Sequence, residues 1–339
     1  MKSAYIADLQ PDQSITSFFL VRVKEIRTSA NTGKAWLHLE LADRSGAIDA
    51  KMWDNFAEVA ASFECDDVVK VRARVKLYHG RNELTVEQIR LAAESEYELE
   101  DFIPHTKQDV EKLYARLAEI ASSVGNPWLR RLLTCILDDP AIAPKFKRAP
   151  AAVTMHHAYI GGLLEHVVSL CGLCRLAAQH YPEASLDLLL TGAILHDIGK
   201  IDELGYDRAF SYTTEGQLLG HIVIAMALVR KKAEAVEGFP PELLTLVEHL
   251  LVSHHGSLEF GSPRPPMFRE AVLLHYLDDL DSKMGAMRAT LESPEGEGEW
   301  TARNPSLRRA LLRVEEYLRG EGIQEKTTAP SESQVARRR

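Results

Sequence analysis

A histidine and an aspartate directly follow a strongly apolar run in the segment LLTGAILHDIGKIDEL (residues 189–204). The leucines, isoleucine and alanine predict a buried helix that leads into His196 and Asp197. A buried carboxylate is costly unless a cation or a metal ion lies beside it. The sequence therefore predicts that a positive charge neutralises Asp197.

More polar residues are embedded in apolar helical segments of the same half of the chain. They are His166, His221, His254, His255 and Asp278. Buried imidazoles and carboxylates are penalised unless their lone pairs are used, and a pair of divalent metal ions inside a helix bundle would use them together. Each histidine taken singly is better explained as a hydrogen-bonded core residue, but that interpretation fits the whole set poorly.

The types of these residues indicate the chemistry. Neutral imidazoles supply nitrogen ligands, an aspartate can bridge two cations, and two metal ions can activate water and stabilise a phosphoryl transition state. We expect Asp197 to serve catalysis as the bridging ligand and Lys200 to contact a substrate phosphate. Histidine and carboxylate ligation without cysteine suits Mn²⁺, which we expect first, and also Co²⁺, Fe²⁺ or Mg²⁺.

Five motifs in this half of the chain resemble the HD-domain superfamily of metal-dependent phosphohydrolases. In order they are HHAYIGGLLEHVVSL, AILHDIGK, TTEGQLLGHI, VSHHG and HYLDDLDSKM. The resemblance implies that the metal ligands are His166, His196, Asp197, His221, His254, His255 and Asp278, with Lys200 as the lysine of the His-Asp motif. It leaves open which of His254 and His255 binds more tightly, and whether Asp281 replaces Asp278.

The N-terminal part has the alternating pattern of β-strands instead. Residues 36–43 place Leu37, Leu39 and Leu41 on one face, and VVKVRARVKLY (68–78) alternates apolar residues, Leu77 the last of them, with cations. Together with AIDAKMW (47–53) and ELTVEQI, these segments predict five short strands and one helical insert at residues 55–63. Such a set favours a small closed barrel.

Basic and aromatic residues share the outward positions of these strands. They are Trp36, His38, Lys51, Trp53, Arg72, Arg74, Lys76 and Tyr78. Cations meet phosphates and flat rings stack on bases, so this face is a candidate interface for single-stranded nucleic acid. The alternative is a solvated charged face on which the tryptophans only pack, since residues 1–92 carry equal numbers of acidic and basic side chains.

The same region resembles the OB-fold family related to tRNA-anticodon-binding domains. The resemblance is carried by LHLELADRSGAIDAKMWDN followed by DDVVKVRARVKLYHGRNELTVEQI. It implies a multidomain protein of α and β structure, in which a five-stranded OB-fold barrel precedes an all-α HD-domain bundle. We expect the OB-fold at 12–92, a linker at 93–108, the helical domain at 109–320 with a last helix over 305–320, and a disordered tail at 321–339.

Composition narrows the class of protein further. The 339 residues are 45% hydrophobic and 26% charged, which is ordinary for a globular protein. No apolar run is long enough to span a membrane, and the N-terminus lacks the apolar region of a signal peptide. Four cysteines do not make a disulfide scaffold, so we expect a reducing cytoplasm and no membrane partner.

An OB-type domain followed by an HD domain resembles the YhaM-type 3′→5′ exoribonucleases over residues 12–315. The residues alone indicate metal-dependent phosphodiester hydrolysis on a ligand that the barrel holds. The resemblance implies single-stranded RNA as substrate, with single-stranded DNA as a further one, exonucleolytic polarity and a homo-oligomer. The alternatives are a phosphodiesterase or phosphatase for small nucleotides, whose barrel serves assembly, and a non-catalytic RNA-binding protein.

Overall fold

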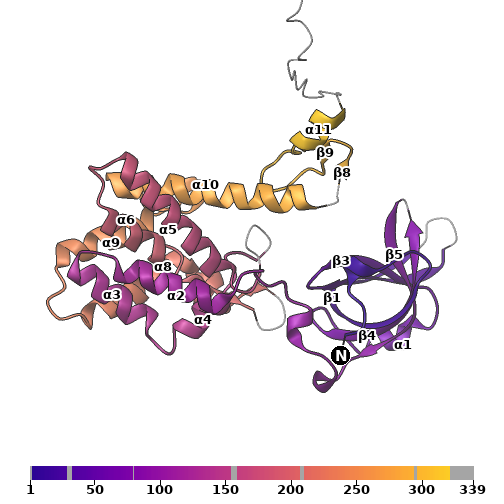
Figure 1. Ribbon diagram of the computed structural model, residues 1–339. Helices are drawn as coiled ribbons and strands as arrows, with labels where there is room; N and C mark the ends of the chain where they lie inside the picture. The colour runs from indigo at the N-terminus through magenta and orange to yellow at the C-terminus, as the bar shows by residue number, and fades with distance from the viewer. Residues whose placement is uncertain are drawn as a thin grey trace, which may run out of the picture. The chain divides into compact units, whose positions relative to one another are not determined.

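The computed structural model describes residues 2–28, 33–78, 80–153, 159–206, 210–293 and 296–320 (Figure 1). The chain divides into two compact units, Met1–Ser282 and Lys283–Arg339. The expected disordered tail at 321–339 lies outside the described residues. The proposed boundaries at 93–108 and 109–320 stay predictions.

Five strands near the N-terminus close into a barrel in the order β1-β2-β3-β5-β4 (Figure 1). They are β1 (Ser14–Thr28), β2 (Ala35–Asp43), β3 (Gly46–Met52), β4 (Val68–Tyr78) and β5 (Arg81–Leu91). All neighbouring pairs are antiparallel except β3 and β5, whose parallel pairing completes the circle. The predicted five-stranded barrel is confirmed.

The alternation of β4 shows how the sequence builds this barrel. Val71, Ala73 and Val75 are buried in the barrel core, while Arg72 and Arg74 between them are exposed. Side chains of a strand point to opposite faces in turn, so the apolar set is removed from water and the cations stay outside. A short helix, α1 (Phe56–Ala60), lies between β3 and β4, within the predicted helical insert.

One residue of this pattern is not where the alternation predicts it. Leu77 was expected to face the core, yet 62% of its surface is exposed. Leu77 pairs with Asn82, and Tyr78 with Arg81, where β4 and β5 form their hairpin. The strand therefore continues past the end of the barrel core, and the leucine stays exposed.

The second half of the first unit is helical. Its helices are α2 (Val110–Ser122), α3 (Pro127–Leu137), α4 (Ala143–Arg148), α5 (Gly162–His180), α6 (Leu186–Leu195), α7 (Lys200–Glu203), α8 (Thr214–Glu234), α9 (Pro241–Ser253) and the first part of α10 (Arg269–Glu292). Strands β6 (Leu204–Gly205) and β7 (Ser211–Tyr212) form a small hairpin among these helices. Across the whole first unit, short 3-10 turns lie at η1 (Ile6–Asp8), before the barrel, and at η2 (Glu94–Glu96), η3 (Leu99–Asp101) and η4 (Leu258–Phe260). The predicted helical bundle is confirmed.

Helix α6 runs through the middle of this bundle's core. All its residues from Leu189 to Leu195 are buried, and Ser185 caps its first turn by accepting a hydrogen bond from the backbone N–H of Leu188. An apolar helix with no polar stripe is stable only when other helices surround it. None of the helices that the structure describes is long and apolar enough to cross a membrane.

The second unit contains the end of α10, a small hairpin and one short helix. The hairpin joins β8 (Gly296–Glu297) to β9 (Trp300–Thr301), and the helix is α11 (Val314–Gly320). The prediction of a helix over 305–320 is wrong for its first part. Asn304 accepts hydrogen bonds from the backbone N–H groups of Ser306 and Leu307, and Leu312 bridges Trp300, so turn and bridge pairing replace the helix there.

Candidate metal centre and nucleic-acid interface

The end of α6 places the histidine–aspartate pair inside the helical bundle. His196 caps the C-terminal end of α6 and is fully buried, and Asp197 follows with 3% of its surface exposed. The turn that carries them packs directly on α8, because a Cβ atom at Gly199 would overlap the carbonyl oxygen of His221. Glycine at this position thus allows the close approach that brings α8 to Asp197.

One cluster of possible metal ligands gathers on the α5 and α10 side of this pair. His166 Nε2 lies 3.1 Å from Asp278 Oδ1 and 3.4 Å from His196 Nε2, and His196 Nε2 lies 3.7 Å from the same Asp278 oxygen. We call His166, His196 and Asp278 the first ligand group. Their ligand atoms all lie within 4.8 Å of one another.

A second group gathers on the α8 and α9 side. It consists of His221, His254 and His255, whose ligand atoms also lie within 4.8 Å of one another. His221 is delivered by a break in α8 at Gly220, whose φ of 72° and ψ of 158° are not helical. His254 caps the C-terminal end of α9, so both elements present a histidine at a helix interruption or end.

Asp197 lies between the two groups and contacts both. Its Oδ2 is 3.3 Å from His196 Nε2 in the first group. Its Oδ1 is 3.5 Å from His221 Nε2 and 3.7 Å from His254 Nε2 in the second. The two oxygens of one carboxylate are therefore divided between the groups, which is the arrangement that a bridging ligand needs.

Three buried atoms at this point have no hydrogen-bond partner among the residues that the structure describes. They are Asp197 Oδ1, His221 Nε2 and His254 Nε2. Leaving a buried acceptor unsatisfied costs on the order of 1–3 kcal/mol, and all three converge on the same point. A divalent cation would satisfy them together, and the surrounding imidazole nitrogens and carboxylate oxygens are the donors that such ions use. The residues present therefore fit a metal site.

Two histidines of the second group, His254 and His255, are neutral. Burial and the neighbouring His196 hold the pKa of His254 well below its ordinary value. Burial and His221 lower the pKa of His255 as well. Only a neutral imidazole can ligate a metal ion, so these two side chains are already in the binding form.

In the first group, by contrast, His166 is protonated. Burial alone would lower the pKa of His166, but hydrogen bonds to Asp278 and Asp281 raise it to about 10. Burial opposes ionisation of Asp278 as well, yet His196 and His166 keep its pKa below the ordinary value. A proton on His166 is thus the charge that a metal ion in the first group would displace.

The sequence left open whether Asp278 or Asp281 is the metal ligand, and the structure places the two at different edges of the His166 ring. Asp278 contacts His166 Nε2, on the side that faces the cluster, whereas Asp281 Oδ2 accepts a hydrogen bond from His166 Nδ1 at 2.8 Å. Asp281 also accepts a hydrogen bond from Ser169 at 2.6 Å. The geometry favours Asp278 as the ligand and gives Asp281 the opposite edge of the imidazole.

Lys200 lies against Asp197 rather than open to a ligand. Its Nζ donates to Asp197 Oδ2 at 2.6 Å. Burial lowers the pKa of Lys200 but the charge of Asp197 outweighs it, so the pKa is raised and the ammonium stays charged. Lys200 therefore neutralises part of the Asp197 charge from one side, while Asp197 Oδ1 faces the second ligand group.

Glu203 belongs to this site although no sequence pattern singled it out. It is 7% exposed, and its Oε1 lies 3.2 Å from His221 Nδ1. The one feature of the sequence that could have pointed to Glu203 is its position three residues after Lys200, on the same short helix, α7.

On the barrel, four of the expected residues form one aromatic cluster. Trp36 stacks on Trp53 with ring centroids 5.4 Å apart, and the Lys51 ammonium lies 5.4 Å from the Trp36 ring and 4.7 Å from the Tyr78 ring. Trp53 and Tyr78 are exposed, at 37% and 57%. Rings held in this way are a platform on which bases can stack.

His38 is less open than its outward position led us to expect. Only 8% of its surface is exposed, since Trp36 packs edge-on against it and its Nε2 lies 2.9 Å from Asp49 Oδ1. The imidazole therefore supports the aromatic cluster, and the expectation of an accessible His38 is wrong.

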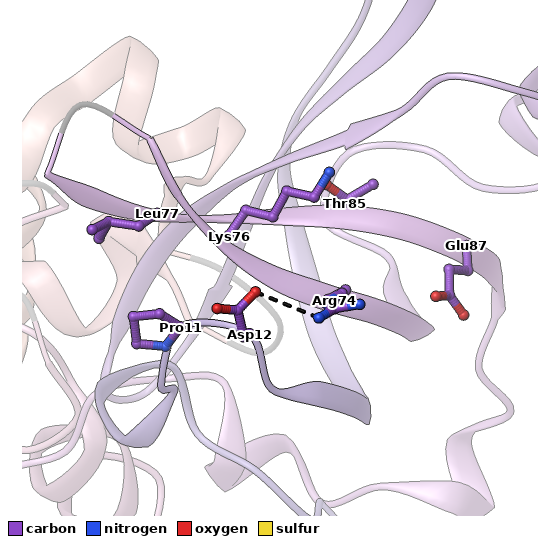
Figure 2. Close-up of a pocket in the computed structure, with 7 residues that line it drawn as sticks. All are labelled: Pro11, Asp12, Arg74, Lys76, Leu77, Thr85 and Glu87. Atoms are coloured by element: carbon purple, nitrogen blue, oxygen red, sulfur yellow. Dashed lines mark hydrogen bonds and ion pairs between the residues drawn. The ribbon is translucent and has the colours of Figure 1, made fainter.

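The cations of β4 are exposed, and acids lie beside them. Arg74 contacts Asp12 at 3.5 Å, and Arg72 contacts Glu87 at 3.2 Å. Figure 2 shows the ion pair between Asp12 and Arg74. Both residues line a pocket of about 530 Å³, together with Pro11, Lys76, Leu77, Thr85 and Glu87. Exposed pairs of this kind are worth roughly 0–1 kcal/mol, so a phosphate can compete with the carboxylates.

The aromatic cluster and the β4 cations belong to one continuous outer surface. Lys51 on β3 pairs in register with Thr85 on β5, and Thr85 pairs with Arg74 on β4. Neighbouring strands lie about 4.8 Å apart, so the platform and the cations are within reach of a few nucleotides of one strand. The structure thus brings seven of the eight predicted residues to an accessible surface, and it buries His38.

A closed five-stranded barrel together with histidine and aspartate groups in a helical bundle defines an HD-domain protein with an OB-fold. Comparison with known families agrees, because the HD-domain family matches residues 163–283 and the OB-fold nucleic acid binding domain family matches residues 20–92. The chain is 38% identical to the 3′-5′ exoribonuclease YhaM of Bacillus velezensis over 292 residues, which are 86% of this chain and 91% of the relative. The chain belongs to the YhaM family.

Two solved structures each match about a third of the chain or less. The second OB-fold domain of replication protein A from Methanococcus maripaludis is 23% identical, with a TM-score of 0.22, and the match covers 28% of this chain and 97% of that domain. The asparaginyl-tRNA synthetase of Entamoeba histolytica is 12% identical with a TM-score of 0.21, over 34% of this chain and 33% of the synthetase. Similarities this low say nothing further about the site.

Proposed function

We propose that this protein is a metal-dependent 3′→5′ exoribonuclease that hydrolyses phosphodiester bonds of single-stranded RNA, with single-stranded DNA as a further substrate. The observation that carries the hydrolytic part is the convergence of Asp197 Oδ1, His221 Nε2 and His254 Nε2 without hydrogen-bond partners among the described residues. Membership of the YhaM family supports the substrate and the polarity of attack.

Two divalent ions fit the two ligand groups. His166, His196 and Asp278 would hold one, His221, His254 and His255 the other, and Asp197 would bridge them. Mn²⁺ suits this mixture of imidazole and carboxylate, and Co²⁺, Fe²⁺ or Mg²⁺ are alternatives. When bound, such ions lower the pKa of water and stabilise negative charge on a phosphoryl group.

The chain's own residues supply the remaining tasks. Asp197 presents one oxygen to each group and Lys200 holds its Oδ2 from outside, so the carboxylate cannot rotate freely. The Lys200 ammonium also adds positive charge beside the site where a phosphate would lie, which favours binding of an anion. Asp281 fixes the edge of His166 that faces away from the cluster.

On the barrel, Trp36 and Trp53 would stack on bases while Arg72, Arg74 and Lys76 would contact phosphates. Stacking does not depend on base identity, and phosphate contacts carry no sequence information. The barrel would therefore hold a single strand of any sequence and raise its local concentration, without taking part in bond cleavage.

The test is hydrolysis by the purified protein with Mn²⁺. A 5′-labelled single-stranded RNA should give a ladder of products shortened from the 3′ end, and a metal chelator should stop the reaction. The control is the same RNA with a blocked 3′ hydroxyl. Turnover of cyclic or linear dinucleotides without any RNA ladder would instead make the protein a phosphodiesterase for small nucleotides. Absence of hydrolysis with every substrate would make it a non-catalytic RNA-binding protein.

We also expect a particular oligomeric state and compartment. Leu218, Leu219 and Val223 are exposed apolar residues of α8, and exposed apolar surface supports a homo-oligomer, which mass measurement in solution would test. The four cysteines are free thiols, and a reducing cytoplasm is the compartment that suits them, which localisation of the tagged protein would test.

A further inference from the structure

Glu203 is a buried acid whose carboxylate the ligand set does not use. Its Oε1 accepts a hydrogen bond from the backbone N–H of His221 at 3.0 Å and lies 3.2 Å from His221 Nδ1. We propose that Glu203 is the positioning residue of the second ligand group: it fixes both the backbone and the imidazole of His221 so that Nε2 faces Asp197. The inference rests on the metal site of the proposed function.

The break in α8 explains why the backbone of His221 needs this acceptor. Gly220 has a φ of 72°, so the helix restarts at His221 and the first N–H groups of the new segment lack helical partners. An acidic side chain that accepts such an N–H acts as a helix N-cap. Glu203 supplies this cap from another element, α7, and thereby ties α7 to the restart of α8.

The backbone of Glu203 is itself held in place. The N–H of Thr213 donates to its carbonyl oxygen at 2.9 Å. A Cβ atom at Gly216 would overlap the same carbonyl group, so α8 passes as close to Glu203 as a glycine permits. The carboxylate therefore has a defined place relative to both halves of α8, which is what a positioning residue requires.

The second contact of Glu203 fixes the tautomer of His221. An Nδ1–H that donates to the carboxylate leaves the Nε2 lone pair free, and Nε2 is the atom without a hydrogen-bond partner among the described residues, 3.5 Å from Asp197 Oδ1. Carboxylates behind ligating histidines also raise their basicity, and removing one costs about 10–100-fold in metal affinity.

The other histidines of the cluster provide an internal comparison. Nδ1 of His196 donates to Ala193 O, that of His254 to Leu251 O and that of His255 to Phe260 O, all within one helical end or turn. His166 and His221 are instead backed by carboxylates, those of Asp281 and Glu203. Each ligand group thus has one carboxylate-backed histidine, so Asp281 is a matched control that acts on the other group.

Binding of Co²⁺ to the apoprotein, followed by its visible absorption and by calorimetry, tests the inference without RNA. Glu203→Ala should weaken one of two ions by about 10–100-fold, and Glu203→Gln, whose amide oxygen can still accept both N–H groups, should lose less. Asp281→Asn should weaken the other ion. Melting curves of the apoproteins establish that the variants fold. If Glu203→Ala does not, Glu203→Gln decides: a loss of affinity as large as that of His221→Ala, although both N–H groups still have their acceptor, overturns the inference.

A double-mutant cycle separates positioning from general damage. In a His166→Ala background, where the second group is intact, Glu203→Ala should retain its full effect on the remaining ion. In a His221→Ala background the same change should have no further effect, because its target is gone. Equal losses in both backgrounds, or none in either, overturn the inference.

The outcome is distinguishable from failure of the proposed function. Co²⁺ binding with the expected cycle but without RNA cleavage overturns the exoribonuclease proposal alone. A wild-type protein that binds no Co²⁺ overturns both the metal site and the role of Glu203.

Discussion

The metal cluster and the barrel face both collect polar side chains, but they hold them in opposite ways. In the cluster, Asp197 and His254 are buried, and each has an atom without a hydrogen-bond partner among the described residues. On the barrel, Arg72 and Arg74 are exposed and each contacts an acid. An unsatisfied buried atom requires a ligand, whereas a solvated ion pair only permits one.

This difference sets the size of the effects to be expected. In a buried site, each removed ligand leaves other charges uncompensated, so the loss is large and specific. On an exposed surface, water and neighbouring acids replace what is removed, so each loss is modest and additive.

The largest effect is expected for Asp197→Ala. The change removes the oxygen pair shared by both ligand groups, and because removing a hydrogen-bond partner of a metal ligand already costs about 10–100-fold, turnover should fall by at least about 100-fold. Metal content measured by mass spectrometry should fall with it. Asp202→Ala, which removes a more exposed carboxylate five residues later, is the control, and full activity of Asp197→Ala would refute the metal site.

Lys200→Ala should separate metal binding from turnover. Lys200 contacts Asp197 but offers no ligand, so the ions should remain while hydrolysis falls, by about 100-fold if its ammonium stabilises the transition state. Metal content and kcat are measured on the same sample. Loss of metal in parallel with activity would show that Lys200 only holds Asp197 in place.

The pH dependence of metal binding tests the protonation of His166. His166 has a pKa of about 10 without metal and must lose its proton to bind, so affinity should rise about tenfold per pH unit below that pKa. Affinity rises with pH because protons compete with the metal ion for the imidazole nitrogen. Calorimetry in buffers of different ionisation enthalpy counts the released protons, and His166→Ala should release one fewer.

On the barrel, Trp53→Ala should weaken binding of single-stranded RNA by roughly tenfold, since stacking contributes about 1–3 kcal/mol per base. Cleavage of a dinucleotide, too short to reach the aromatic cluster, should not change. Trp300→Ala alters an exposed tryptophan of the C-terminal unit and serves as the control. Equal binding by all three proteins would make the barrel face a solvated surface.

The smallest effect is expected for Arg72→Ala with Arg74→Ala. Each cation that no longer meets a phosphate of a single strand reduces the salt slope of binding by about 0.7, and the acids beside both arginines reduce the net gain. Kd is measured at several salt concentrations. Glu87→Gln should act in the opposite direction and tighten binding slightly, because it releases Arg72 from its carboxylate.

The sequence predicted the barrel and the ligand types for one physical reason. Alternation and apolar runs report which side chains leave water, and burial of an apolar residue depends mainly on its own face of its own element. Leu37 and Leu39 are fully buried as this pattern predicts. Polar residues in apolar helix, such as His196, are conspicuous against the same pattern.

Predictions from the local sequence pattern failed where the environment of a residue depends on parts of the chain that are not its sequence neighbours. Leu77 is exposed because its strand outruns the core, and His38 is covered by Trp36 and Asp49. The expected helix from 305 begins only at Val314, since Asn304 and Trp300 draw the preceding segment into turn and bridge pairing. These outcomes depend on which surfaces meet.

The sequence predicted a barrel of five strands and the polar residues that gather inside the helical bundle. The partners of the acids around them depend on the tertiary structure. Asp281 meets His166 across 115 positions of chain and Glu203 meets His221 across 18, on the edges of the imidazoles that face away from the cluster. Hydrogen bonds act over a few ångströms in space whatever the separation in sequence, so no spacing rule could have assigned Glu203 to His221.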